Sequence, residues 1–411
     1  MHILFKEVKK NHALLLSLFI TILFGITFWQ NFTQHYAQHF SLMAESFIHG
    51  RFDLMRLDPE TGSLDIFFHN GKMYFANFPF PAVILIPFFF IFQKFNLFFY
   101  QGYLQFFLNI GVFYICYLLA KKFKFNYLDS LYLALAFFFG SNYAFAALYT
   151  GSWFYSQPVT VLLLLLALYE WYTKRRLLVV GTLLGCLLAT RATAGLAAAF
   201  FGIALLFEKG TIFKEKFKKL ILLGSPILIS FVLLLGYNQA RFGSPWETGY
   251  MDDNISPEFQ VTMLKKYGIF KLENIPTNIY WNFLSLPEPI MAPGTYHLIP
   301  PFLDPNPLGM SFFIMSPIFL LIFKSLKKPS GDTVYLWIGS LFVLIPLLMW
   351  YSTGFWQIGA RYILDFFPLW FILLLKVFPN EKLKDSHRLI ILLSCLLNLF
   401  WIMPRLITGR W

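Results

Sequence analysis

The stretch from residue 121 to residue 176 reads KKFKFNYLDSLYLALAFFFGSNYAFAALYTGSWFYSQPVTVLLLLLALYEWYTKRR. It begins and ends with a basic cluster, and an apolar run, a short polar segment and a second apolar run lie between the clusters. About 20 helical residues cross the hydrocarbon core of a bilayer. Short basic loops stay on the cytoplasmic side, whereas translocated segments lack this bias. The stretch therefore predicts two transmembrane helices that leave the cytoplasm and return to it.

The same alternation extends along the whole chain. Six basic clusters hold 21 of the 33 Lys and Arg residues, at 6–10, 121–124, 174–176, 209–219, 324–328 and 376–388. Placing all six in the cytoplasm puts the N-terminus there and the C-terminus outside. The segments between clusters then face outward. We expect a multi-pass protein of the bacterial inner membrane.

Composition supports a membrane protein, because 58% of the residues are hydrophobic and only 13% are charged. A soluble globule of 411 residues needs more polar surface than this. We expect an all-α polytopic protein, a single transmembrane domain over 1–411 with about eleven transmembrane helices. The expected spans are 11–30, 97–120, 127–148, 157–172, 177–190, 192–207, 220–236, 309–323, 334–351, 355–375 and 389–403.

The apolar segment before residue 97 is treated differently. Counting 79–93 as a crossing would invert every later loop, and Pro79, Pro81 and Pro87 disfavour a straight helix there. We therefore predict a re-entrant or interfacial helix over 81–93. The net charge of +12 resides largely in the juxtamembrane clusters, which indicates contact with lipid headgroups and no nucleic-acid partner. The three cysteines lack paired spacing, so neither a disulfide framework nor a zinc site is expected.

Two outward segments, 31–80 and 237–308, are longer than a connection requires, and such loops are usually functional. The first predicts an amphipathic helix on the membrane surface that stops at Gly50. Its apolar face would carry Tyr36, Phe40, Met43, Ala44 and Phe47, and its polar face Gln38, Ser41, Glu45 and His49. Farther on, Asn70-Gly71 predicts a hairpin turn that brings Asp65 near Tyr74.

Ionisable residues within a membrane are costly and mark candidate functional sites. Arg191, Arg361 and Asp365 lie at or inside the predicted boundary. Two structural alternatives remain open: Arg361 pairs with Asp365 four residues later, or Arg191 extends to the interface.

Asp65 and Glu45 are candidate bases, although a solvated carboxylate in an outer loop is the plain alternative. His35 and His39 have the spacing of two metal ligands without a third, and a polar helix face explains them as well. Asp252 and Asp253 would suit a divalent cation or simply a turn in water. No nucleotide-binding or hydrolase motif is present.

Several short motifs together resemble the GT-C superfamily of polytopic glycosyltransferases, which includes protein O-mannosyltransferases and the aminoarabinose transferases of lipid A, and in particular its bacterial members. The resemblance covers nearly the whole chain. It rests on the order and spacing of Met43 to Arg51, Asp65, Gly71, Tyr74, Phe78 to Ala82, Ala189 to Arg191, Tyr237-Asn238 with Arg241 to Pro245, Leu308 to Ser311 with Ser316-Pro317, and Gly359 to Tyr362.

This resemblance implies transfer of a sugar from a polyprenyl-phosphate donor to an acceptor outside the membrane. It also shows a departure, because better-known members carry an acidic residue where this chain has Gln34, His35, Tyr36 and Gln38. Asp65, Glu45 or a histidine must then replace the usual base, or the chain is a non-catalytic envelope-assembly protein. A transporter or flippase of lipid-linked saccharide is the third hypothesis.

For the transferase we assign roles to ten residues. Asp65 is the first candidate base and Glu45 the second. Arg361, with Arg191 and Arg241 in support, would bind the donor phosphate, because guanidinium groups match phosphate geometry. The substrate groove would be formed by Tyr74, Tyr237, Asn238, Glu247 and Tyr362. The sequence identifies no specific metal or cofactor, and a divalent cation is compatible with the hypothesis.

Overall fold

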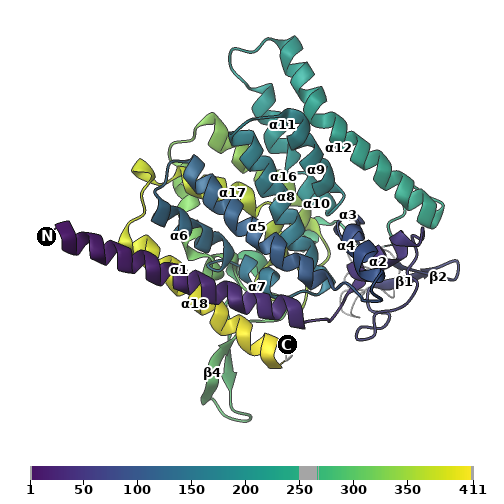
Figure 1. Ribbon diagram of the computed structural model, residues 1–411, viewed down its shortest axis with the longest axis horizontal. Coiled ribbons are helices and arrows are strands. Elements are labelled where there is room, and N and C mark those ends of the chain that lie inside the picture. Colours follow the sequence, from purple (N-terminus) through teal and green to yellow (C-terminus); the bar gives the residue numbers. More distant parts are fainter. Residues whose placement is uncertain (1, 250–265, 267, 409–411) are drawn as a thin grey trace.

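The computed structural model describes residues 2–249, 266 and 268–408. It shows a bundle of helices (Figure 1), and six of those described are long and apolar enough to cross a membrane. They are α1 (His2–Thr33), α5 (Gln101–Lys122), α8 (Ser152–Tyr172), α12 (Phe213–Phe242), α16 (Gly331–Met349) and α18 (Asp385–Thr408). The protein is therefore a multi-pass membrane protein by helix length and hydropathy.

The remaining expected spans are occupied by shorter or interrupted helices, so the number eleven is not established. These are α6 (Tyr127–Phe138) and α7 (Tyr143–Leu148), α9 (Leu177–Leu188), α10 (Ala192–Gly195) and α11 (Ala198–Leu206), α15 (Phe312–Met315) and the 3₁₀ helix η3 (Pro317–Leu326), and the 3₁₀ helix η4 (Arg361–Asp365) and α17 (Phe367–Lys376).

Buried amide side chains stabilise the α6–α7 break and the end of α7. In the break, Asn398 donates to the carbonyls of Phe139 and Ser141. At the C-terminal end of α7, Asn109 and Asn31 each donate to the carbonyl of Ala147 at 2.9 Å. A backbone group without a partner is costly in a membrane, so interrupted helices need such donors.

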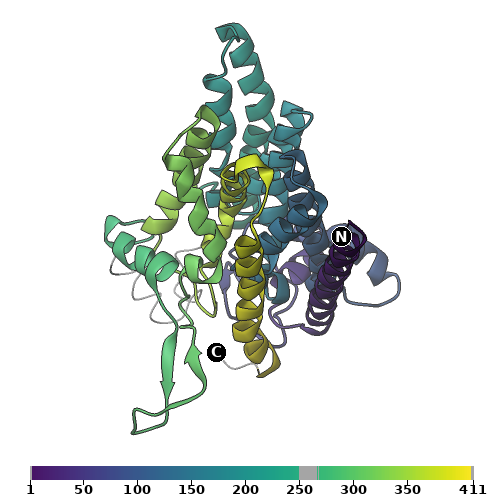
Figure 2. The same ribbon diagram turned by 90° about the vertical axis from the view of Figure 1, so that its left-hand side faces the viewer.

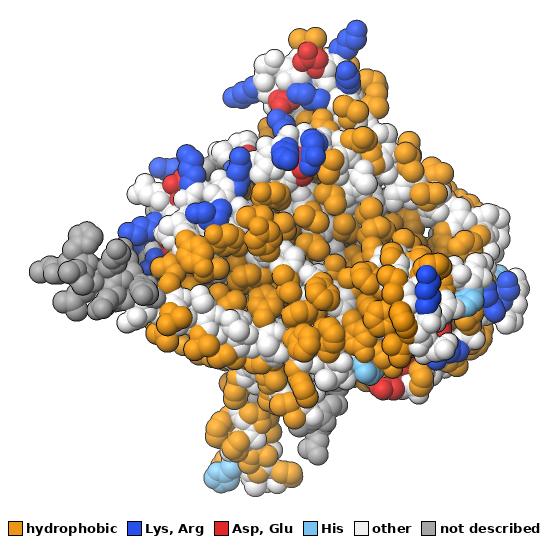
Figure 3. All heavy atoms as spheres, viewed as in Figure 1, with side chains coloured by type: hydrophobic (Ala, Val, Ile, Leu, Met, Phe, Trp, Pro, Cys, Tyr) orange, Lys and Arg blue, Asp and Glu red, His pale blue; other side chains and the backbone are white. Residues whose placement is uncertain are grey.

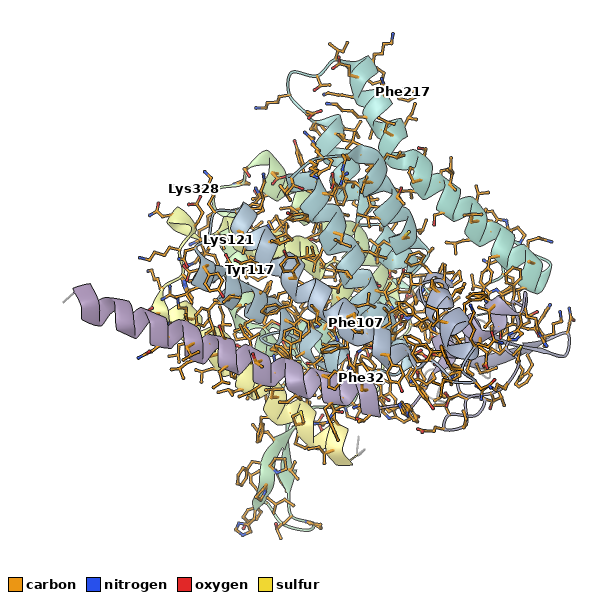
Figure 4. All side chains as sticks on the ribbon, viewed as in Figure 1. Phe32, Phe107, Tyr117, Lys121, Phe217 and Lys328 are labelled. Atoms are coloured by element: carbon orange, nitrogen blue, oxygen red, sulfur yellow. The ribbon has the colours of Figure 1, made fainter. Side chains whose placement is uncertain are left out.

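The five basic clusters from residue 121 onward lie together at one end of the bundle. Lys and Arg side chains gather over its upper end in Figure 3, and Figure 4 places Lys121 and Lys328 there. Ion pairs connect the clusters: Glu208 accepts from Arg175 at 2.7 Å and from Lys219 at 2.5 Å. Asp129 likewise pairs with Arg388 at 2.7 Å. A single basic end is the arrangement that the cluster pattern predicts.

Smaller elements gather at the opposite end of the helices (Figure 2). They are α2 (His39–Ile48), the paired strands β1 (Ile66–His69) and β2 (Lys72–Phe75), α3 (Phe80–Val83), α4 (Ile86–Gln93), the 3₁₀ helix η1 (Leu272–Asn274), α14 (Ile275–Ile279), the π-helical turn η2 (Tyr280–Leu284), and the paired strands β3 (Glu288–Met291) and β4 (Leu298–Asp304). The short 3₁₀ helix η5 (Pro379–Glu381) belongs instead to the segment of the last basic cluster.

Helix α2 packs inside this end of the protein. Other parts of the chain cover more of its surface than the predicted amphipathic helix on the membrane would have covered. Ser41, on the expected polar face, is fully buried, and so is Phe40 on the apolar face. Gln38, which precedes the helix, accepts a hydrogen bond from the backbone of Gln101 at 3.0 Å. Glu45 and His49 keep more exposure. Protein therefore covers positions at which the sequence pattern predicts water.

Candidate functional site

A cavity of roughly 360 Å³ opens at the end of the bundle opposite the basic clusters. Its walls come from the first long loop, the start of α8, the α9–α10 break, the end of α16 and the segment from 350 to 362. The lining combines Asp65, Arg191 and Arg361 with Asn77, Ser156, Thr190, Thr193, Thr248 and Ser352 and with apolar and aromatic residues. Three of the predicted site residues that carry charge thus share one cavity.

Asp65 is positioned by the turn before β1. Its backbone is left-handed, with φ of 58°, a conformation that Asp adopts more readily than most residues. One carboxylate oxygen accepts a hydrogen bond from the indole nitrogen of Trp153, in the first turn of α8. Burial raises the pKa of Asp65 to about 6, against the opposing effects of the Trp153 hydrogen bond and the Arg361 charge. A carboxylate with this pKa is a stronger base than an ordinary aspartate.

Arg191 is held by a carboxylate from the far end of the sequence. Its Nε donates to Oδ1 of Asp365 at 2.6 Å, and the hydroxyl of Thr193 donates to Oδ2 at 2.5 Å. Asp365 is fully buried, whereas Arg191 keeps some exposure. The alternative pairing of Arg361 with Asp365 is wrong, because Asp365 contacts the α9–α10 break.

Arg361 differs from Arg191 in its partners. Its backbone N–H donates to Gln357 at 3.2 Å, and its Nη1 donates to the carbonyl of Phe355 at 3.4 Å. Among the residues that the structure describes, no carboxylate lies within ion-pair distance of this guanidinium. Arg361 therefore brings a positive charge to the cavity that is not neutralised by direct contact within this part of the chain.

Tyr362 links the two arginines. The guanidinium carbon of Arg191 and that of Arg361 each lie 5.3 Å from the centroid of its ring. Cation–π contacts of this kind hold guanidinium groups in place without neutralising them. Tyr362 also lines the cavity, the position that the sequence predicts for a groove residue.

Aromatic side chains make up much of the remaining wall, namely Phe78, Trp153, Phe270, Trp350, Tyr351, Phe355 and Trp356. Such faces suit apolar chains and the C–H faces of sugars, while the charged groups fix orientation. The cavity can therefore hold an amphipathic, anionic molecule beside a candidate base.

Glu45 does not line this cavity. Its two carboxylate oxygens accept from Nε and Nη2 of Arg56, at 3.1 and 3.3 Å, on the surface of the first loop. The bidentate ion pair places Glu45 in a structural contact between α2 and the loop that follows it. Of the two candidate bases, only Asp65 faces the cavity.

Arg241, Tyr237, Asn238 and Tyr74 lie apart from the main cavity. The Arg241 guanidinium donates to Asn238 at 2.8 Å and stacks 4.0 Å from the centroid of Tyr237. Tyr74 lines a separate cleft of roughly 320 Å³ together with Gly50, Arg51, Phe52, Asp53, Lys72 and Ala240.

The hairpin that the sequence predicts is present, but Asp65 and Tyr74 line different hollows of the protein. The hairpin pairs Tyr74 with Phe67, and Asp65 precedes the first paired residue. Tyr74 stacks on Phe67 and lines the separate cleft, whereas Asp65 lines the main cavity. The turn at Asn70-Gly71 itself is present, with φ of 51° and 72°.

Glu247 folds back on its own backbone, where one carboxylate oxygen accepts from the N–H groups of Thr248 and Gly249. His35 and His39 have different ring partners: His35 stacks on Tyr100, and His39 stacks on Phe75. No group of three or more His, Cys, Asp or Glu side chains that suits a metal occurs within the described ranges. Asp252 and Asp253 lie outside the described residues.

Comparisons with known proteins give one solved structure to report. No protein-family model matches the sequence, and no curated protein matches it. The chain is similar to the crystal structure of the Archaeoglobus fulgidus oligosaccharyltransferase in the apo form, with a TM-score of 0.44 and 13% sequence identity. The alignment covers 94% of this chain and 54% of the archaeal one, so this chain spans about half the length of that protein.

Sequence reasoning missed Trp153, Thr193 and Trp356. Trp153 follows Gly151 and Ser152 at the start of a helix, and nothing in that order reveals that its indole meets Asp65, 88 positions earlier. Thr193 follows Arg191 by two positions. The two polar residues lie at the predicted break between spans, and this pattern could have indicated that Thr193 belongs to the same site. Trp356 belongs to an aromatic run whose cavity-facing members cannot be distinguished by type alone.

Proposed function

We propose that the protein transfers a sugar from a polyprenyl-phosphate donor to an acceptor on the outer face of the membrane. The observation that carries this proposal is the presence of Asp65 and Arg361 in one cavity. A base with a pKa near 6 and a guanidinium that no carboxylate of the described residues contacts are the two groups that such a transfer needs. The resemblance to GT-C glycosyltransferases in the sequence motifs supports the same reaction.

The step is a substitution at the anomeric carbon of the sugar. Asp65 accepts the proton of the acceptor hydroxyl or amine as its oxygen or nitrogen forms a bond to that carbon. The bond from the carbon to the phosphate oxygen breaks, and its electron pair leaves with the polyprenyl phosphate. Charge therefore increases on the phosphate, where a preoriented cation has most effect.

Arg361 would meet this growing charge directly. Arg191 carries a weaker net field into the cavity, because Asp365 neutralises it at 2.6 Å. The two guanidinium groups each contact the ring of Tyr362. Arg361 offers the phosphate a full positive charge. Arg191, already paired with Asp365, offers it further N–H donors but little net charge. Together they suit the phosphate group of a polyprenyl-phosphate sugar.

The place of the cavity also favours the enzyme over a transporter. Its polar lining comes from loop residues and helix ends, whereas transporter sites lie near the bilayer midplane between related halves. The outward direction follows from the basic end of the bundle, which we assign to the cytoplasm of a bacterial inner membrane. The acceptor would then approach from outside.

The test compares cells that carry the wild-type protein, Asp65→Asn, or Glu45→Gln as a matched carboxylate control. We expect Asp65→Asn to remove one sugar from surface glycans and to leave its polyprenyl-phosphate donor on the outer leaflet, while Glu45→Gln keeps transfer. Accumulation of the donor on the cytoplasmic leaflet would support a flippase instead. Unchanged glycans with a folded Asp65→Asn protein would overturn the assignment of Asp65 as the base.

Binding of the donor phosphate is tested separately with purified protein in detergent. A long-chain polyprenyl phosphate without a sugar is the probe, and its affinity is measured for wild type, Arg361→Gln and Arg241→Gln. We expect a loss of about tenfold or more for Arg361→Gln, because a charge-assisted hydrogen bond contributes about 1.5–3 kcal/mol. Arg241→Gln, outside the cavity, should bind nearly as wild type does; equal losses in both variants would contradict the assignment.

A further inference from the structure

The β3–β4 hairpin is an apolar projection from the bundle (Figure 2). Residues 289–303 contain no Asp, Glu, Lys or Arg. Large apolar side chains on it are exposed: Met291, Tyr296, Leu298, Ile299, Phe302 and Leu303, with Tyr296 at 85% and Phe302 at 52%. Two strands alone bury too little surface to be stable in water, so this hairpin requires an environment that receives its apolar residues.

The base of the hairpin is fixed to the end of a membrane-spanning helix. Arg405, in the last turn of α18, donates to the carboxylate of Asp304 at 2.5 Å and to the carbonyl of Pro305 at 2.8 Å. The anchor places the start of the hairpin at the level where α18 ends. Arginines near the ends of transmembrane helices lie at the interface between lipid and water.

The exposed face of α18 leads to the same place. Its outward residues follow helical spacing and are about half exposed or more: Leu389, Leu393, Leu396, Phe400 and Ile407. This stripe is the surface that a lipid-facing helix presents. Figure 3 shows hydrophobic side chains continuing from the middle of the bundle onto the hairpin. The apolar surface of the hairpin is therefore continuous with the lipid-facing belt.

The strand edges of the hairpin are poorly suited to pairing with another strand. Pro289 lies in β3 and Pro300 and Pro301 lie in β4, and proline has no N–H to donate. The hairpin can therefore contact its surroundings through its apolar side chains and not through backbone pairing. An open two-stranded edge also has backbone groups that need water or headgroups, so it cannot enter the hydrocarbon core.

We propose that the β3–β4 hairpin docks into the headgroup layer of the bilayer at the end of the bundle opposite the basic clusters. Tyr296 and His297 at its turn have the amphipathic rings that favour this layer. The hairpin then acts as a lateral support beside α18. This inference is independent of the proposed sugar transfer.

The β1–β2 hairpin supplies a matched control in the same chain, because its turn is polar, with His69, Asn70 and Lys72. A nitroxide label is introduced through Tyr296→Cys or, in a second protein, through Asn70→Cys. Both proteins are placed in nanodiscs of phosphatidylethanolamine and phosphatidylglycerol. Collision rates with oxygen, which partitions into lipid, and with a water-soluble nickel chelate are then measured. Wild-type protein treated with the same label gives the background from the native Cys116, Cys186 and Cys395.

We expect the label at 296 to collide more with oxygen than with the chelate, and the label at 70 to show the reverse. If both labels collide equally with the chelate, the hairpin lies in water and the proposal is wrong. Spin–spin broadening between labels at 296 would show that a second copy covers the hairpin, which would also overturn it. Thr295→Cys reports on the same turn if Tyr296→Cys does not fold.

A pair of substitutions tests whether the apolar face of the β3–β4 hairpin is what keeps the label away from the chelate. Phe302→Ser, combined with Thr295→Cys, should raise the collision rate of the label with the chelate severalfold, because it removes an apolar side chain from the docking face. Phe68→Ser, at 50% exposure on β1, removes an equally exposed side chain and should leave position 295 unchanged. An equal effect of the two substitutions would contradict docking through the β3–β4 face.

Discussion

Arg191 and Asp365 form an ion pair of 2.6 Å although 174 positions separate them in the sequence. The pair connects the break between α9 and α10 to η4, the short 3₁₀ helix that begins with Arg361. Because Asp365 is fully buried, its charge is compensated only by such contacts. The same ion pair therefore holds both walls of the cavity and sets the charge that Arg191 presents to it.

Asp365→Ala should destabilise the protein by about 3–5 kcal/mol, the usual cost of removing one partner from a buried ion pair. Chemical denaturation of the purified protein in detergent measures this loss. Replacing both partners, as Arg191→Met with Asp365→Leu, should recover much of the stability because no buried charge remains without a partner. A single variant as stable as the wild type would show that the pair contributes nothing.

This pair also shows where sequence reasoning stops. Arg361 and Asp365 are four apart, which favours contact on an α-helix. They occupy a 3₁₀ helix, which has three residues per turn, so the two side chains point in different directions. The partner of Asp365 is a residue from another part of the fold, and local spacing contains no information about such a contact.

The membrane class and the basic end were predictable, because apolar length and charge clusters are properties of the sequence itself. The helix breaks were harder to locate. The span expected at 127–148 is interrupted near Gly140, where Asn398 from α18 bonds to the open backbone, and it ends at α7, where Asn31 and Asn109 do the same. Asp65, Arg191, Arg361 and Tyr362 line one cavity, whereas Glu45 and Arg241 lie outside it because of packing that spacing does not encode.

Sugar transfer should decrease as the pH falls through about 6, because protonation removes the basic form of Asp65. The folded pKa is raised above its ordinary value, so the folded state holds this proton more tightly than the unfolded chain does. The contribution of Asp65 to stability is therefore largest below pH 4 and is lost as the pH rises to about 6. Transfer rates and denaturation measured from pH 4 to 8 check both effects. Asp65→Asn should remove this stability change, and its persistence would assign it to another group.

Trp153→Phe should shift the acid limb of the transfer profile to higher pH. The indole N–H stabilises the ionised form of Asp65, so its removal raises the carboxyl pKa further. Trp356→Phe is the matched control, since Trp356 lines the same cavity from another element. It should change the affinity for substrate without moving the limb. Equal shifts in both variants would indicate a change in cavity size, with no special role for the hydrogen bond.

Gly359→Ala should lower both stability and transfer. A Cβ at this position would lie 2.7 Å from Cβ of Asn142 and would also contact the sulfur of Met315, so the segment before Arg361 must move. Overpacking of this kind costs about 1–3 kcal/mol. Gly202→Ala has nothing within 4 Å of the added carbon and should be neutral. Thermal unfolding of the two proteins compares them directly, and a neutral Gly359→Ala would show that this segment yields easily.

Asn109→Ala should destabilise the packing of α7 against α5. The amide donates to Ala147 at 2.9 Å and to Asn31 at 3.2 Å, and it accepts from the hydroxyl of Tyr143 at 2.7 Å. Its removal leaves at least the Tyr143 hydroxyl without a partner, at about 1–3 kcal/mol for each buried group left unsatisfied. Phe107→Ala, on the same helix α5 with 61% exposure, removes a larger side chain that faces outward (Figure 4). It should cost less, because lipid replaces the contacts that it loses. If denaturation in lipid nanodiscs shows the reverse order, packing against lipid, and not the amide network, controls the stability of this part of the bundle.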